Sequence, residues 1–124
     1  MRRVVVDAGV LLGWFDGGSP HRPLRAEYEA GALAVIGPRG VIGDVLGALA
    51  EQGVRPERLA RIGIELQRIG LQLQDPPMEA LATWLAKGLP PGRAAYPALA
   101  ASLEVPLVTG DPELQRVAAS IPRD

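Results

Sequence analysis

The sequence contains no cysteine and only one histidine, His21. Without cysteine the chain cannot form a disulfide, a thiolate metal site or a cysteine nucleophile. A single histidine also leaves no partner with which to build a histidine zinc site. These absences favour an intracellular protein, and we expect a cytoplasmic location.

Long apolar runs are also missing. No stretch approaches the ~20 apolar residues that a membrane span needs, so we predict a soluble protein without a membrane partner. The formal net charge is −1 at pH 7, which provides no general basic field for holding a polyanion. Any contact with RNA would therefore depend on a local group of arginines. The net charge by itself neither supports nor excludes RNA.

Lysine is nearly absent from the sequence, and asparagine is wholly absent. Lys87 is the only lysine among 13 basic residues, no asparagine occurs, and there are 12 prolines. Few labile amides and many loop prolines are typical of thermostable proteins. A GC-rich genome gives the same bias toward arginine, so the composition is compatible with a thermophile, with such a genome, or with both.

The 124 residues are enough for one domain with a real core, and we predict a single domain over residues 1–124. Short apolar runs alternate with segments of helical periodicity along the chain. This alternation predicts a three-layer α/β/α fold with a central parallel sheet. We expect strands at residues 3–6, 32–36, 70–74 and 105–109. Helical segments are expected near residues 10–15, 23–30, 41–52, 56–69, 78–86, 94–103 and 112–119, with a break at 16–20.

Two aspartates follow expected strands from opposite ends of the chain. Asp7 ends the run of Val4 to Val6, and Asp111 follows the strand near Val108. Because the carboxyl ends of parallel strands collect ligands at one edge of a sheet, the two carboxylates should meet there and form a metal or phosphate site. The alternative is that each aspartate simply caps the helix that follows it.

A third carboxylate, Asp44, lies in the helix after the second expected strand. Val41, Val45 and Leu49 mark the apolar face of that helix, and Asp44 is near the border of this face. Its side chain can therefore face the same sheet edge as the other two aspartates. An exposed surface carboxylate is the alternative interpretation.

Four segments, in this order and spacing, resemble successive blocks of the PIN domain family. They are residues 4–12 (VVVDAGVLL), 44–49 (DVLGAL), 95–100 (AYPALA) and 106–111 (PLVTGD), and the resemblance spans nearly the whole chain. The family has a compact α/β/α fold and includes the VapC toxins of bacterial toxin–antitoxin pairs, which are metal-dependent ribonucleases. The resemblance thus implies a Mg²⁺ or Mn²⁺ site, an RNA substrate, an antitoxin partner and a homodimer.

Position by position, the resemblance assigns roles to four residues. Asp7 matches the first acidic ligand, Asp44 stands where the family usually has glutamate, and Asp111 matches the last acidic residue. Thr109 matches the hydroxyl residue before it and would orient a ligand or a water. A divalent ion held by Asp7, Asp44 and Asp111 would neutralise their mutual repulsion and activate water for attack on a phosphodiester.

The chain departs from the family pattern at three positions. Arg93 replaces an acidic residue three positions before Tyr96, Gly9 replaces a frequent serine or threonine, and Pro97 is unusual within its helix. Because proline suits only the first helical turn, Pro97 predicts that this helix starts later than in the family.

The position of the Arg93 side chain distinguishes two hypotheses. If it stays solvated in the loop at residues 90–92, the three aspartates can hold a metal and the protein is an endoribonuclease. If it pairs with Asp7 or Asp111, its guanidinium displaces the metal, and the protein is a degenerate PIN domain that serves as a binding module. Asp7→Asn would stabilise the metal-free protein in the first case and destabilise it in the second.

Other residues have less specific interpretations. The two tryptophans, Trp14 and Trp84, are expected in the core or an interface rather than on a base-stacking platform. Scattered arginines could contact RNA phosphates, or could belong to an ordinary solvated surface. They are Arg2, Arg3, Arg22, Arg25 and Arg116.

Overall fold

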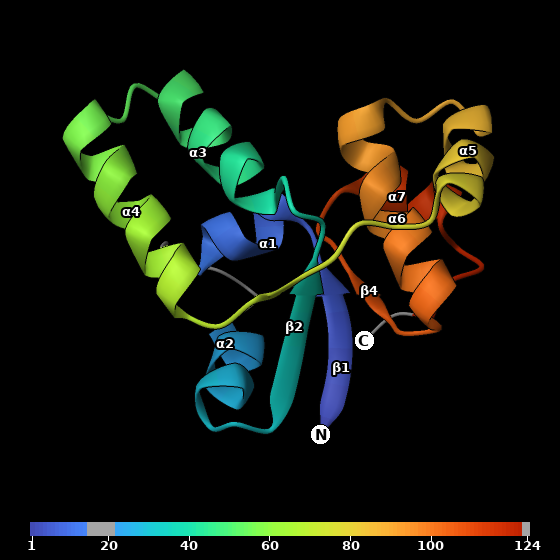
Figure 1. Ribbon diagram of the computed structural model, residues 1–124, viewed down its shortest axis with the longest axis horizontal. Coiled ribbons are helices and arrows are strands. Elements are labelled where there is room, and N and C mark those ends of the chain that lie inside the picture. Colours follow the sequence, from blue (N-terminus) through green and yellow to red (C-terminus); the bar gives the residue numbers. More distant parts are fainter. Residues whose placement is uncertain (15–21, 123–124) are drawn as a thin grey trace.

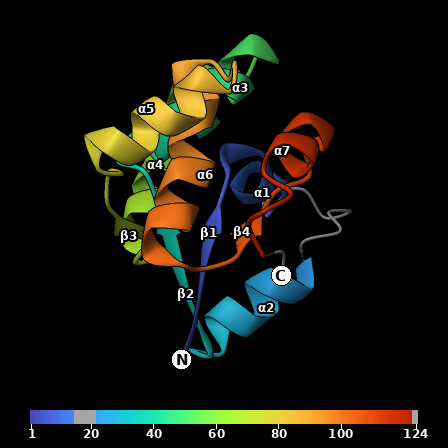
Figure 2. The same cartoon turned by 90° about the vertical axis from the view of Figure 1, so that its right-hand side faces the viewer.

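The computed structural model describes residues 1–14 and 22–122. For Arg22 it describes the backbone only. The described chain forms a four-stranded, all-parallel sheet in the order β3-β2-β1-β4. Figure 1 shows α1 to α4 on one side of this sheet and α5 to α7 on the other. Figure 2, turned by 90°, shows the strands in their order across the sheet. The predicted three-layer α/β/α architecture with a parallel sheet is confirmed.

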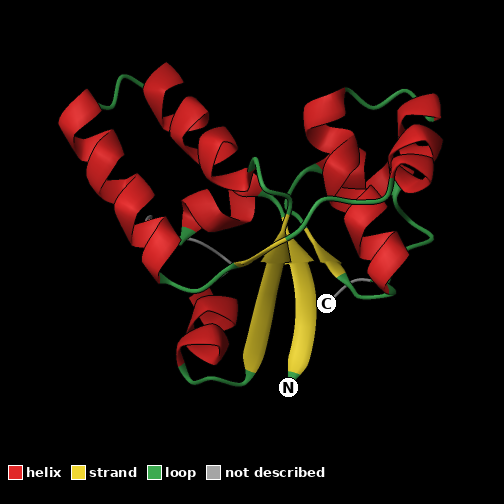
Figure 3. Ribbon diagram, in the orientation of Figure 1, coloured by secondary structure: helices red, strands yellow, loops and turns green. Residues whose placement is uncertain are grey.

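The elements follow the alternation expected from the sequence (Figure 3). The strands are β1 (Arg2–Val6), β2 (Leu33–Gly37), β3 (Gln72–Leu73) and β4 (Leu107–Val108). The helices are α1 (Ala8–Gly13), α2 (Arg22–Glu29), α3 (Val41–Glu51), α4 (Pro56–Arg68), α5 (Met78–Ala86), α6 (Pro91–Leu103) and α7 (Pro112–Val117). Phe15, His21 and the predicted break at residues 16–20 lie outside the described residues.

The centre of the sheet is buried on both faces. Val4, Val5 and Val6 of β1 are all 0% exposed although they are consecutive. In a strand, neighbouring side chains point to opposite faces, so an unbroken apolar run is what a strand with helices on both sides requires. Both tryptophans are 5% exposed and belong to the core, as predicted.

The register of β1 with β4 brings the two ends of the chain together. Val5 pairs with Leu107 and Val6 pairs with Val108. The residues that follow these pairs, Asp7 and Thr109, are therefore neighbours where both strands end. The Asp7 N–H donates to the Val108 carbonyl at 3.3 Å, which continues the pairing to the edge of the sheet.

The start of α6 differs from the expectation. We predicted a helix from residue 94 that begins late because of Pro97, but α6 begins at Pro91 and continues through Pro97. Pro90 is extended and Pro91 occupies the first helical turn, where a proline is favoured. Pro97 cannot donate to the carbonyl four residues earlier, a loss that costs roughly 3 kcal/mol in an isolated helix. Its burial together with residues 98–100 against the core offsets this cost.

Helices α3 and α4 form an antiparallel pair joined by a short turn. Gly53 in this turn has φ +85°, a conformation that favours glycine. A Cβ added at Gly63 of α4 would lie 3.2 Å from Leu46 Cδ1 of α3, so the absence of a side chain there allows close packing. Within residues 1–14 and 22–122, no helix is long and apolar enough to span a membrane.

Candidate acidic site

Asp7 is both a helix cap and a site residue. Its Oδ1 accepts a hydrogen bond from the Val10 N–H at 2.9 Å, which caps α1, and its Oδ2 accepts a hydrogen bond from the Thr109 hydroxyl. The side chain is buried, with 7% of the residue exposed. A buried carboxylate needs such donors, because without them its desolvation would be costly. The cap and site interpretations of Asp7 are therefore compatible.

Thr109 joins Asp7 to the loop that carries Asp111. The Thr109 Oγ1 that donates to Asp7 also accepts from the Asp111 N–H at 3.0 Å. Asp111 in turn caps α7, since its Oδ1 accepts the Glu113 N–H at 2.9 Å. The sequence predicted that Thr109 orients a ligand or a water. In the structure its hydroxyl orients the carboxylate of Asp7.

Asp44 lies in the first turn of α3 and is exposed. Its Oδ2 accepts a hydrogen bond from the hydroxyl of Tyr96 in α6 at 2.7 Å. Tyr96 is 3% exposed, and burial, followed by the hydrogen bond to Asp44, raises its pKa well above the ordinary tyrosine value. The phenol therefore remains a donor. Sequence reasoning placed Tyr96 in a family block but did not identify it as the partner of Asp44.

Arg93 reaches the acidic side chains from the first turn of α6. Its Nη2 lies 3.1 Å from Oδ2 of Asp111, and its Nη1 lies 3.0 Å from Oε2 of Glu113. Of the two interpretations of Arg93, the structure has the pairing with Asp7 or Asp111, and the pair is made with Asp111, but the guanidinium bridges two carboxylates instead of binding one in bidentate fashion. The alternative of a solvated Arg93 outside the pocket is wrong. Glu113 was missed by the sequence analysis.

The three predicted aspartates and Arg93 line one cavity of about 580 Å³. Its walls come from the ends of β1 and β4, from α3, and from the start of α6. The lining residues are Asp7, Ala8, Gly9, Asp44, Gly92, Arg93, Tyr96, Gly110, Asp111 and Leu114. With its side chains charged, the lining has three negative groups and one positive group, so the cavity remains acidic.

The carboxylates of the three aspartates all have partners within the chain. Both carboxylate oxygens of Asp7 and both of Asp111 contact protein donors, and Oδ2 of Asp44 accepts from Tyr96. Among the residues that the structure describes, no group of three or more His, Cys, Asp or Glu side chains could hold a metal ion. The aspartates share a cavity, but their oxygens are directed toward hydrogen-bond and ion-pair partners within the chain.

Two of the arginines considered for RNA phosphates have acidic partners. Arg2 forms an ion pair with Glu27, and the Arg25 Nε lies 2.9 Å from Glu29 Oε1. These contacts hold β1 to α2 and stabilise α2 itself. The side chain of Arg22 lies outside the described residues.

Comparisons with known proteins support the fold. The structure is similar to the crystal structure of PAE2754 from Pyrobaculum aerophilum, with a TM-score of 0.70 and 22% sequence identity. The similarity covers 94% of this chain and 84% of that one. No protein-family model matches the sequence, and no curated protein matches it either. At this identity the structural likeness concerns the architecture alone.

Proposed function

We propose that the chain is a PIN-type domain in which Arg93 has taken the place of a divalent cation, and that it acts as a binding module. The ion pair of Arg93 with Asp111 carries this proposal. The four sequence blocks that resemble the family, and the α/β/α architecture, support the PIN assignment. In the resembling family an acidic residue stands where this chain has Arg93.

A guanidinium can replace the charge of a metal ion but not its chemistry. It stays protonated, so it neutralises nearby carboxylates permanently. It has no open coordination position, and it cannot lower the pKa of a bound water as a divalent cation does. The chain therefore keeps an acidic cavity without the group on which hydrolysis by the resembling family depends.

The remaining charge of the cavity indicates what it binds. Three carboxylates against one guanidinium would repel an RNA phosphate and attract a cationic group. We propose that the cavity receives a basic side chain from a protein partner. An antitoxin-like protein and a second copy of the chain are the partners that the family resemblance implies.

A metal-dependent endoribonuclease is the second candidate, because Asp7, Asp44 and Asp111 do line one cavity. The Arg93 side chain is 45% exposed and that of Asp111 is 23% exposed. Ion pairs at such positions contribute little free energy, roughly 0–1 kcal/mol. A tightly binding cation could therefore compete with Arg93 for the aspartates.

Calorimetric titration with Mn²⁺ and cleavage of a fluorogenic single-stranded RNA separate the two candidates. We expect the wild-type protein to bind no Mn²⁺ and to leave the RNA intact in Mg²⁺ or Mn²⁺. We expect Arg93→Asp, which restores the acidic residue of the family, to bind Mn²⁺. Wild-type cleavage that requires Mn²⁺ and is abolished by Asp7→Asn would establish the ribonuclease instead.

A further inference from the structure

The turn between α3 and α4 contains a second charged surface, which shares no lining residue with the acidic cavity. It is a hollow of about 570 Å³, which we call the arginine hollow. Its lining residues are Gln52, Gly53, Val54, Arg55, Glu57, Arg58 and Arg61. The lining thus has three guanidinium groups and one carboxylate, although the chain as a whole has a net charge of −1. This local excess of positive charge is suited to an anionic ligand.

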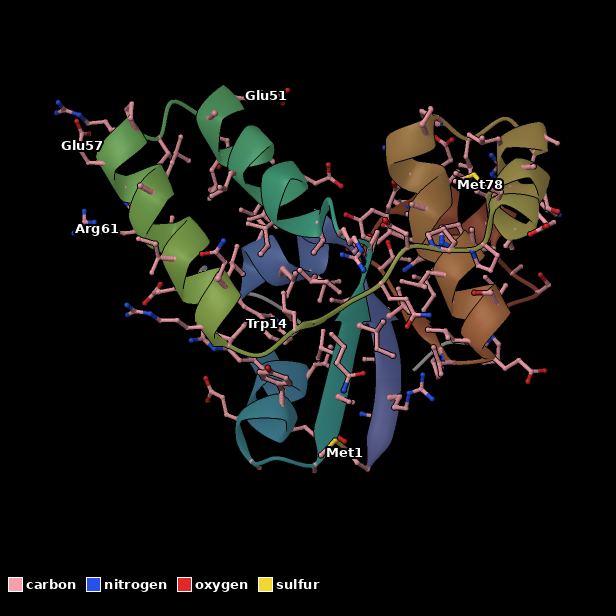
Figure 4. All side chains as sticks on the ribbon, in the orientation of Figure 1. Met1, Trp14, Glu51, Glu57, Arg61 and Met78 are labelled. Atoms are coloured by element: carbon pink, nitrogen blue, oxygen red, sulfur yellow. The ribbon has the colours of Figure 1, made fainter. Side chains whose placement is uncertain are left out.

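The arginines of this hollow are little engaged by the rest of the chain. Arg55 Nε lies 3.8 Å from Glu57 Oε2, but the two side chains are 86% and 74% exposed, so the pair is weak. Among the residues that the structure describes, no carboxylate lies within ion-pair distance of Arg58 or Arg61. Figure 4 shows Glu57 and Arg61 projecting outward from α4. Their charges are available to a ligand from solvent.

Helical spacing sets the geometry of the two unpaired arginines. Arg58 and Arg61 are three positions apart in α4, so their side chains leave the same side of the helix one turn apart. Arg55, just before the helix, extends this row toward the turn. A ligand with several anionic groups in succession can therefore contact more than one guanidinium at once.

A second hollow of about 570 Å³, with both polar and apolar lining residues, continues from the arginine hollow, between α1, α3 and α4. The two share Gln52, Val54 and Arg58. The apolar side chains that line the second hollow are Leu12, Leu49, Val54 and Ile62. The charged surface and these apolar side chains are therefore parts of one continuous depression.

We infer that this depression binds an acidic peptide segment of a protein partner. Glutamate or aspartate side chains would pair with Arg55, Arg58 and Arg61, and a neighbouring apolar side chain would contact the apolar residues of the second hollow. Carboxylates match the planar donors of arginine, and burial of an apolar anchor adds affinity. This inference goes beyond the proposed function, because it concerns a different surface and does not depend on whether the acidic cavity holds a metal.

The lining residues favour a peptide over single-stranded RNA. Proteins that bind single strands combine a basic groove with aromatic side chains on which the bases stack. Among residues 1–14 and 22–122, no aromatic residue lines either hollow. Leu12 and Leu49 are partly exposed, and their apolar side chains suit a leucine or valine side chain better than a phosphodiester backbone.

Fluorescence anisotropy with a labelled peptide of sequence Glu-Glu-Leu-Leu-Glu-Glu tests the inference. We expect saturable binding that weakens as NaCl rises from about 50 mM to about 500 mM. Arg61→Glu should weaken binding about tenfold or more, since charge reversal replaces an attraction by a repulsion. Arg68→Glu is the matched control, because it makes the same charge change on α4 outside both hollows, and it should alter affinity less than about twofold.

A second variant tests the apolar part. Val54→Ser removes an apolar lining group from the turn without changing the charge, and we expect it to weaken binding several-fold. Melting curves of all variants establish that they remain folded. The inference is overturned by any of four results: no saturable binding up to about 1 mM peptide, equal effects of Arg61→Glu and Arg68→Glu, no effect of Val54→Ser, or tighter binding of oligouridine RNA than of the peptide.

Discussion

The guanidinium of Arg93 lies 3.1 Å from Oδ2 of Asp111, and this contact joins the start of α6 to the start of α7. It places a permanent positive charge beside a carboxylate that the family resemblance assigns to a metal ion. The same guanidinium also contacts Glu113, so one positive charge is shared by two acidic side chains. Arg93 pairs with Asp111 and not with Asp7. A substitution of Asp111 therefore tests more directly whether its charge stabilises or destabilises the metal-free protein.

Asp111→Asn should lower the free energy of unfolding by about 0.5–1 kcal/mol, measured by urea denaturation in the presence of a chelator. Asparagine caps a helix as well as aspartate does, so the main loss is the partly exposed ion pair with Arg93. Mutual repulsion among unneutralised aspartates would give the opposite sign, because removal of one charge would then stabilise the metal-free protein. A stabilised Asp111→Asn protein would argue against neutralisation by Arg93.

Thr109→Val should destabilise the protein by about 1–3 kcal/mol, because it removes the hydroxyl that donates to the buried carboxylate of Asp7. The same hydroxyl accepts the Asp111 N–H, which also loses its partner. Thr109→Ser is the matched control, since it keeps the hydroxyl and removes only a methyl group. Urea denaturation of the two variants should show a clearly larger loss for valine. Equal losses would mean that the hydroxyl contributes little.

Tyr96→Phe should reduce the loss of stability at alkaline pH. Burial and the hydrogen bond to Asp44 raise the pKa of Tyr96, so the folded protein keeps the phenol proton when the unfolded chain, with a tyrosine pKa of about 10, loses it. The stabilisation is complete below about pH 10 and declines as the pH rises above it. Melting temperatures between about pH 8 and pH 11.5 should therefore fall more steeply for wild type than for Tyr96→Phe.

The remaining tyrosine provides an internal reference for this experiment. Tyr28 also has a raised pKa because of burial, and it is present in both proteins. Its contribution should leave a shallower alkaline decline in Tyr96→Phe. Parallel pH profiles for the two proteins would show that Tyr96 ionises equally readily in the folded and unfolded states.

Local signals in the sequence were sufficient to predict most of the fold. The consecutive apolar residues of β1, the glycine in the α3–α4 turn and the prolines at the starts of α4 and α7 each have a direct local cause. The start of α6 was the main error. A rule about proline in an isolated helix does not include the burial of Pro97 against the core, which offsets the lost hydrogen bond.

The site was predicted in part, for a reason that follows from the topology. Asp7 and Thr109 meet because β1 and β4 are adjacent parallel strands, and the order of strands and helices made that adjacency expected. The contacts of Asp44 with Tyr96 and of Arg93 with Glu113 depend on the direction of side chains on separate helices. Periodicity gives the face of a helix but not the partner that a long side chain reaches.

The melting temperature with and without about 10 mM Mn²⁺ tests the central claim most directly, for wild type, Arg93→Asp and Arg116→Asp. Ligands that bind only the folded state raise the melting temperature, and the stabilisation grows with the logarithm of the ratio of ligand concentration to Kd. We predict no rise for wild type or for Arg116→Asp, which changes the charge of α7 outside the cavity, and a clear rise for Arg93→Asp. A rise for wild type that Asp7→Asn abolishes would contradict the account, because it would show that the aspartates hold a metal ion despite Arg93.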